Sequence, residues 1–165
     1  MTEQQIREKQ IKLLQQNLLS IRKIAGWTAE QLGDKIGVTK QTISNLENGK
    51  TPMNFTQYIA IRSVLDYEVE TNKENEVLPK VITILLDKND EINDEDYTKV
   101  KAAVETVAAS AAGGIAGAAL TSAFTGLVSP TLAGIGLGLL GPIGLIAGGA
   151  VAGSAHWLKK ILNSK

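Results

Sequence analysis

The chain has 165 residues, with 17 Lys or Arg and 17 Asp or Glu, so its formal net charge is zero. It contains no cysteine, which excludes disulfides, thiolate metal sites and thiol catalysis and which fits a reducing cytoplasm. The charge is unevenly spread, because residues 106–158 contain no Asp, Glu, Lys or Arg, and such a run is rare in a soluble domain.

A first helix is expected over residues 4–25, where apolar side chains recur at helical spacing. Gly26 should end this helix. Thr28 is suited to cap a second helix, and Gln31 three residues later completes the pattern of a capping box.

The second helix should be followed by a tight turn and a short third helix. Gly37 allows a turn with positive φ at no steric cost. Thr39 is suited to cap a helix over residues 40–47, and the Asn48-Gly49 pair should end it.

A fourth helix is expected to open at Thr56 and to continue through Leu65. The four helices would make a compact all-α bundle of about 65 residues, and a domain of this size has a thin core. Residues 1–70 are therefore interpreted as one domain.

The next segment, residues 71–105, is interpreted as a polar linker with a short helix. Pro79 suits the start of that helix, although the apolar run after it also fits a short buried strand. We favour the helix. The acidic stretch 87–96 predicts a turn region, and a further helix should begin between Asp94 and Tyr97 and run into the uncharged segment.

The second and third helices carry the pattern of a helix-turn-helix that reads DNA. In this motif the turn presents the following helix to the major groove, where polar side chains near its N-terminus read base edges. The side chains that fit base contacts are Lys40, Gln41 and Asn45. The groups that fit contacts with the DNA backbone are those of Thr28, Thr39, Thr42, Ser44, Asn48 and Lys50.

Residues 18–66 resemble the Cro/Xre family of phage repressors. The motif runs through Ile21-Arg22, Trp27-Thr28-Ala29-Glu30-Gln31-Leu32, Gly37-Val38-Thr39-Lys40-Gln41-Thr42-Ile43-Ser44 and Leu46-Glu47-Asn48-Gly49-Lys50. The resemblance implies a five-helix fold and operator binding, usually as a dimer. It also implies the base-contact and backbone-contact positions given above, and a structural salt bridge between Arg22 and Glu47. A domain that keeps the fold but binds a protein instead of DNA is the alternative.

Gly33 departs from the family pattern, which commonly has Ala at this position. Glycine keeps the small size that the position needs. It should weaken the second helix by about 1 kcal/mol relative to alanine.

The uncharged segment 106–158 predicts a Gly/Ala-rich hydrophobic helical hairpin that breaks at Ser129-Pro130, followed by a basic tail over 159–165. Each arm exceeds the roughly 20 residues that cross a bilayer. Glycines four apart would place small residues on one helix face for close packing, namely Gly113, Gly117, Gly134, Gly138, Gly144, Gly148, Gly149 and Gly153. Because strongly apolar residues are few, a soluble oligomer core and a flexible or aggregation-prone tail remain alternatives.

Neither a metal, a cofactor nor enzymatic activity is expected. The sole histidine, His156, has no acidic neighbour, and the acidic stretch 87–96 lacks the glycine of a calcium loop. No phosphate-binding Gly-Lys-Ser/Thr loop and no nucleophile–base set is present.

The sequence therefore predicts a sequence-specific DNA-binding regulator, a repressor, that is tethered or assembled through the hairpin. The expected partners are double-stranded DNA, further copies of the chain and membrane lipid through residues 106–158. The DNA-binding domain would be cytoplasmic and attached to the inner face of the cell membrane. The alternative is a membrane-active effector whose hairpin forms a pore or lesion and whose N-terminal domain is autoregulatory.

Overall fold

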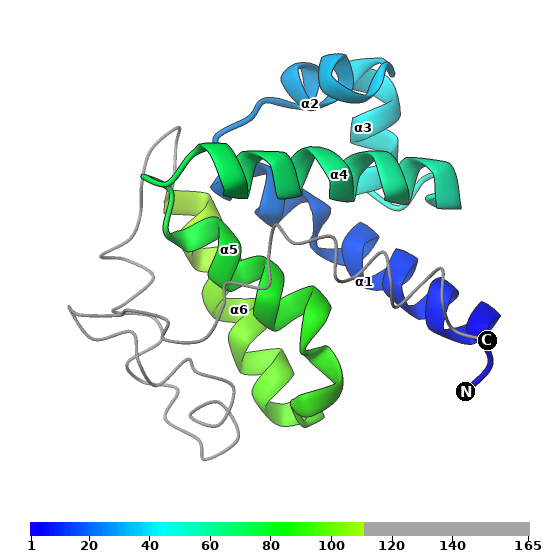
Figure 1. Ribbon diagram of the computed structural model, residues 1–165, viewed down its shortest axis with the longest axis vertical. Helices are drawn as coiled ribbons and strands as arrows, with labels where there is room; N and C mark the ends of the chain where they lie inside the picture. Colours follow the sequence, from blue (N-terminus) through cyan, green and yellow to red (C-terminus); the bar gives the residue numbers. More distant parts are fainter. Residues whose placement is uncertain (111–165) are drawn as a thin grey trace.

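The computed structural model describes residues 1–110, and all regular elements in this part of the chain are helices, as the sequence predicted (Figure 1). Its elements are α1 (Glu3–Ile24), α2 (Ala29–Ile36), α3 (Lys40–Glu47), α4 (Phe55–Thr71), α5 (Val77–Ile82), the π-helical turn η1 (Thr83–Asp87), the 3-10 turn η2 (Asn89–Glu91) and α6 (Asp94–Ser110). The predicted hairpin beyond residue 110 and the basic tail lie outside the described residues.

Side chains cap the first residues of α2 and α3 where the sequence predicted. The Thr28 hydroxyl accepts a hydrogen bond from the Gln31 backbone N–H at 3.1 Å, and the Gln31 amide oxygen accepts one from the Thr28 N–H at 2.8 Å. The Thr39 hydroxyl accepts from the Thr42 N–H at 3.2 Å. These bonds satisfy backbone donors that a helix leaves without partners in its first turn.

The start of α4 differs from the predicted one. The helix begins at Phe55, and Asn54 rather than Thr56 forms its cap. The Asn54 side chain accepts from the Gln57 N–H at 2.8 Å, and the Gln57 side chain accepts in return from the Asn54 N–H at 3.0 Å. Asparagine is the stronger capping residue, which explains why it prevails over the nearby threonine.

The start of α5 also precedes the predicted one, because Pro79 is the third residue of the helix rather than the first. Proline is tolerated there since a first-turn N–H has no partner within the helix. The Asn75 side chain accepts from the Leu78 N–H at 3.1 Å and donates to the Ile24 carbonyl at 2.8 Å. The α4–α5 turn is thereby fixed to the end of α1.

Helix α1 lies at the centre of the described fold. It contacts α3 and α4 on one side and α5, η1 and α6 on the other (Figure 1). Leu14, Leu18 and Ile21 of α1 are almost completely buried, and they belong to one hydrophobic cluster that draws on every α-helix.

Residues 77–108 contribute to this same cluster, which differs from the polar linker that the sequence predicted. Their buried apolar side chains are Val77, Leu78, Val81, Ile82, Ile84, Leu85, Leu86, Ile92, Val100, Val104, Val107 and Ala108. The charged residues of the segment are mostly on its outer surface. Its average composition therefore conceals an apolar side that packs on α1.

Helix α6 runs in the same direction as α1. Lys9 pairs with Asp90 just before α6, and the Asn17 amide donates to the Tyr97 hydroxyl at 3.1 Å in its first turn. Helix α6 therefore ends towards the C-terminal end of α1, and Figure 1 shows it below the end of α4. Within residues 1–110, no helix combines the length and the hydropathy that crossing a bilayer requires.

Candidate nucleic-acid interface

The turn between α2 and α3 depends on two glycines. Gly37 adopts a left-handed conformation with φ of 76°, as the sequence predicted. Gly33 lies against the next segment of backbone, because a Cβ atom placed on it would come within 2.6 Å of the Val38 carbonyl oxygen. The Val38 N–H donates to the Gly33 carbonyl at 2.9 Å. The glycine that lowers the helix propensity of α2 thus permits its close approach to α3.

Helix α3 separates an inward apolar side from an outward polar side. Ile43 and Leu46 are almost fully buried. Lys40 and Gln41 are exposed, and Asn45 is half-buried. The Gln41 amide N–H donates to the Asn45 amide oxygen at 2.9 Å. This bond orients both amides and leaves the Gln41 oxygen as an acceptor and the Asn45 NH₂ as a donor.

The candidate groups for contacts with the DNA backbone lie on α3 and in the segments before α2, before α3 and after α3. The exposed ones are Thr28, Thr39, Asn48 and Lys50, and the half-buried ones are Thr42 and Ser44. The Thr39 and Thr42 hydroxyl oxygens lie 3.1 Å apart. A hydroxyl that accepts a hydrogen bond as a helix cap keeps its own hydrogen for a further acceptor. Contacts of these groups with phosphate stay predictions.

An ion pair joins α1 to the end of α3. The Arg22 guanidinium donates to both carboxylate oxygens of Glu47 and, through Nη1, to the Trp27 carbonyl at 2.7 Å. Both charged side chains are largely buried, with 11% and 7% exposed. The pair implied by the family resemblance is present, and it fixes α3 and the α1–α2 loop on the central helix.

Gln15 organises the loop after α3, and the sequence analysis missed it. Its amide N–H group donates to the Leu46 carbonyl at 3.0 Å and to the Thr51 carbonyl at 2.7 Å. Its amide oxygen accepts from the Met53 N–H at 2.9 Å. The available signal was its spacing, since Gln15 falls on the apolar stripe of α1, where a polar group needs partners.

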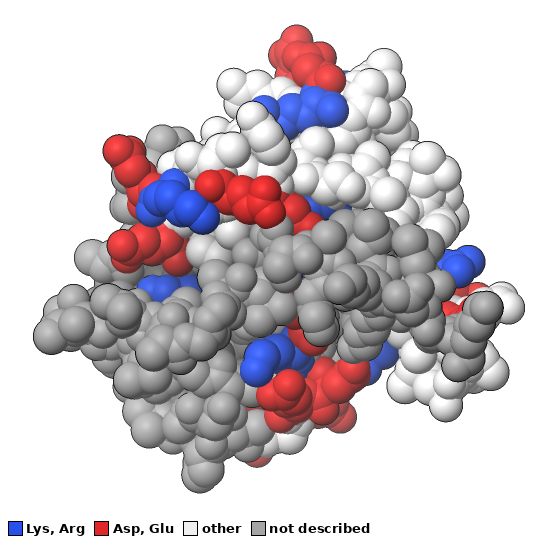
Figure 2. Space-filling view, in the orientation of Figure 1, with Lys and Arg blue, Asp and Glu red and all other residues white. Residues whose placement is uncertain are grey.

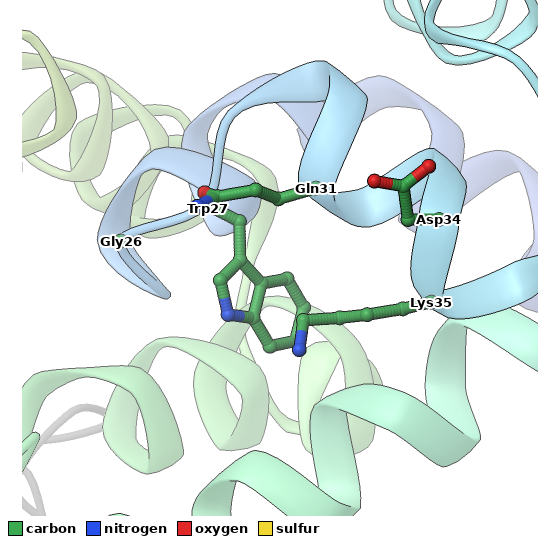
Figure 3. A pocket seen from close by; sticks show the side chains of 5 residues that line it. All are labelled: Gly26, Trp27, Gln31, Asp34 and Lys35. Carbon is green, nitrogen blue, oxygen red and sulfur yellow. The ribbon is translucent and has the colours of Figure 1, made fainter.

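Trp27 anchors the start of α2. Figure 3 shows the Lys35 side chain extending across the indole, and its Nζ atom lies 4.9 Å from the ring centroid. The two residues line an open depression of about 530 Å³ together with Gly26, Gln31 and Asp34. This cation–π contact fixes the indole against α2.

Acidic and basic side chains are interspersed on the face shown in Figure 2. Near α3, Lys40 and Lys50 are exposed cations, and neighbouring Glu47 is compensated by Arg22. Attraction for a polyanion would therefore rest on a few local groups. Within residues 1–110, no cluster of three or more His, Cys, Asp or Glu is arranged to hold a metal ion.

Residues 18–71 match a family model described as helix-turn-helix. The match contains the last part of α1 and all of α2, α3 and α4. It leaves out four parts of the chain: the uncharged segment, the whole of α5, the whole of α6, and the first fifteen residues of α1. Neither the curated proteins nor the solved structures include a chain that matches this one.

Proposed function

We propose that this protein is a sequence-specific repressor of transcription, because residues 18–71 match a helix-turn-helix family model, which supports a DNA-binding regulator. The observation that carries the proposal is the outward side of α3. It presents an exposed lysine, Lys40, beside two amides, Gln41 and Asn45, that are already oriented by a mutual hydrogen bond.

In the proposed mechanism, α3 enters the major groove and its side chains read base edges. A carboxamide pairs well with adenine, which offers one donor and one acceptor there, and a lysine pairs with the two acceptors of guanine. The capped ends of α2 and α3 and the Asn48–Lys50 loop would contact the flanking phosphates. The Arg22–Glu47 ion pair holds α3 at a fixed angle to the core during this contact.

Two copies of the domain would bind two half-sites about one helical turn apart, as is usual for this motif. The bound dimer would cover promoter DNA and exclude the polymerase. No enzymatic step is required for this function.

Substitution of the two amides tests the readout. Gln41→Ala and Asn45→Ala should each weaken binding to a duplex selected from a randomised library by about 1–3 kcal/mol. Binding to random-sequence duplex should change little, because phosphate contacts dominate it. Fluorescence anisotropy titrations measure both affinities.

Thr98→Ala, an exposed polar-to-alanine change on α6, is the control for this experiment. It should leave both affinities unchanged. If the two amide variants bind the selected duplex as tightly as the parent protein does, α3 does not read the bases.

We further propose that residues 106–158 tether the DNA-binding domain to the membrane or assemble it. The proposal is supported by the complete lack of charge and by the four-residue glycine spacing. The direction of α6 also suits it. Helix α6 ends near the C-terminal ends of α1 and α4 (Figure 1). The Asn48–Pro52 loop, which is proposed to contact DNA, precedes the N-terminal end of α4.

Fractionation tests the tether. The full-length protein and a chain cut after residue 110 would be expressed, and cell membranes washed with carbonate and then with detergent. A membrane anchor requires that only the full-length protein stay with the membrane until detergent is added. If neither chain sediments with membrane, sizing must show a larger assembly for the full-length protein alone; equal sizes would contradict both roles.

A further inference from the structure

A groove of about 500 Å³ lies between α1 and the loop that follows α3. Lys12 and Gln16 line it on the α1 side, and Asn48 and Gly49 line it on the loop side. The two α1 residues precede the range 18–71, so the family match covers only one side of the groove. The groove is therefore a feature of this chain that the helix-turn-helix motif does not account for.

The groove has a fixed shape. The three hydrogen bonds of Gln15 hold the loop against α1 at Leu46, Thr51 and Met53. Gly49 has φ of 68°, and no atom lies within 4 Å of the position that its Cβ would occupy. The loop side is thus open to a ligand, while its backbone is kept in place from α1.

The charges around the groove favour an anion. Glu47 is the one carboxylate among the lining residues, and Arg22 binds both of its oxygens. Lys12 is exposed and forms no ion pair within residues 1–110. The side-chain donors at the groove are the Lys12 ammonium and the amides of Gln16 and Asn48, groups that bind phosphate oxygens well.

We propose that this groove binds a phosphate of the DNA backbone beside the bases contacted by α3, with Lys12 and Gln16 as donors from α1. The inference rests on the proposed function, because that function places the DNA backbone next to the loop that follows α3. It extends the DNA-binding surface beyond the matched domain, onto the middle of α1.

Removal of the lysine charge is the first test. The full-length Lys12→Ala protein would be titrated by fluorescence anisotropy at several salt concentrations with the library-selected duplex and with a random-sequence duplex. The slope of log K against log salt is negative, and loss of one phosphate contact lowers its magnitude by about 1. At 0.15 M salt this corresponds to about five-fold weaker binding, and the loss should be similar for both duplexes.

Lys73→Ala is the matched control, because this exposed lysine follows the other end of α4. Its affinities and salt slope should equal those of the parent protein. Lys12 is exposed, so its substitution should leave the thermal unfolding curve unchanged.

Addition of a positive charge is the second test. It predicts tighter binding, which a misfolded variant would not show. Gln16→Lys should raise the magnitude of the salt slope by about 1 and tighten binding about five-fold at 0.15 M salt. The control is Thr71→Lys, which adds a lysine at the end of α4 and should have no such effect.

The outcomes separate this inference from the proposed function. If Lys12→Ala and Gln16→Lys both leave the salt slope unchanged while Gln41→Ala still weakens operator binding, the groove does not face DNA and only this inference is overturned. If the library yields no preferred duplex for the parent protein, the proposed function is overturned, and the inference that rests on it is overturned too.

Discussion

The two sides of α1 are stabilised in different ways. On the α2–α4 side, short-range hydrogen bonds from Thr28, Thr39 and Asn54 define where each helix begins. On the α5–α6 side, Asn75 and Asn93 also accept from first-turn N–H groups of α5 and α6, but α5 is short and continues directly into a π-helical turn. That side depends on long-range contacts to α1 and α4. The α2–α4 side therefore consists of regular, locally capped helices, whereas the irregular α5–η1 segment depends more on tertiary packing.

A buried charge network joins the two sides. Arg62 of α4, completely buried, donates to Asp87 at the end of η1 over 2.8 Å. Tyr58 and Asp66 of α4 are buried near the same charges. Buried ion pairs contribute little net stability when intact, but removing one partner is costly because it leaves a charge in the core.

Asp87→Ala should have the largest effect on stability. It removes a carboxylate that compensates Arg62 and should lower the free energy of unfolding by about 3–5 kcal/mol. Urea unfolding followed by circular dichroism measures the change. Hydrogen exchange should show that the amides of α5 and η1 lose protection before those of α3.

The double variant Arg62→Met/Asp87→Leu sharpens this test. It replaces both charges with apolar groups and should recover part of the lost stability, but not all of it, because the buried Asp66 carboxylate then loses the nearby guanidinium. If the single variant loses less than about 1 kcal/mol, the ion pair does not hold the two sides together.

Alkaline pH should lower the free energy of unfolding by a smaller amount, through ionisation of Tyr58 in the same buried network. Burial raises the pKa of Tyr58 to about 12, Arg62 opposes the rise, and Asp87 and Asp66 add to it. Because the unfolded phenol ionises near 10, the stabilisation is complete below pH 10 and is lost as the pH rises from 10 to 12. The loss should reach about 2–3 kcal/mol.

Urea unfolding midpoints measured from pH 9 to pH 12 test this expectation. Tyr58→Phe should remove that part of the pH dependence, because phenylalanine does not ionise. An identical decline in the variant and in the parent protein would contradict the assignment to Tyr58.

Gly33→Ala should have the smallest effect, and it probes the DNA-binding half. A methyl group 2.6 Å from the Val38 carbonyl oxygen forces the backbone to shift, at a cost of about 1–3 kcal/mol. The gain in helix propensity is only about 1 kcal/mol, so the net effect should be a lower melting temperature.

Asp34→Ala, at the next position of α2, is the control for the glycine substitution. Asp34 is exposed, so alanine there should change stability only by its better helix propensity, and the melting temperature should rise slightly. If Gly33→Ala raises the melting temperature as well, α2 has room for a side chain at this position.

Apart from the Arg22–Glu47 pair, which the family resemblance implied, the parts of the fold predicted from the sequence depend on residues a few positions apart. The Thr28–Gln31 capping box, the Gly37 turn and the end of α3 are of this kind. Asn54 and Gln57 form the same pattern, so the start of α4 lies at this capping box and not at Thr56, the residue predicted to open the helix. Lys40, Gln41 and Asn45 could be placed on the outward side of α3 because Ile43 and Leu46 fix the inward side.

The parts that were not predicted depend on residues far apart in the chain. Gln15 contacts carbonyls 31 and 36 positions later, and Arg62 meets its aspartate 25 positions later. Such partners follow from the way helices pack, which one sequence does not specify. For the same reason, the close approach at Gly33 could not be distinguished from a merely weak helix.

The parallel course of α1 and α6 has a consequence for the time course of synthesis. Lys9 and Asn17 are made early, but their partners Asp90 and Tyr97 lie 81 and 80 positions later. At about 5–20 residues per second, the ribosome needs on the order of ten seconds to supply them. Helices α2 to α4 are complete during that interval, while one side of α1 still lacks its neighbour. The nascent chain thus exposes an apolar surface for a period set by the speed of translation.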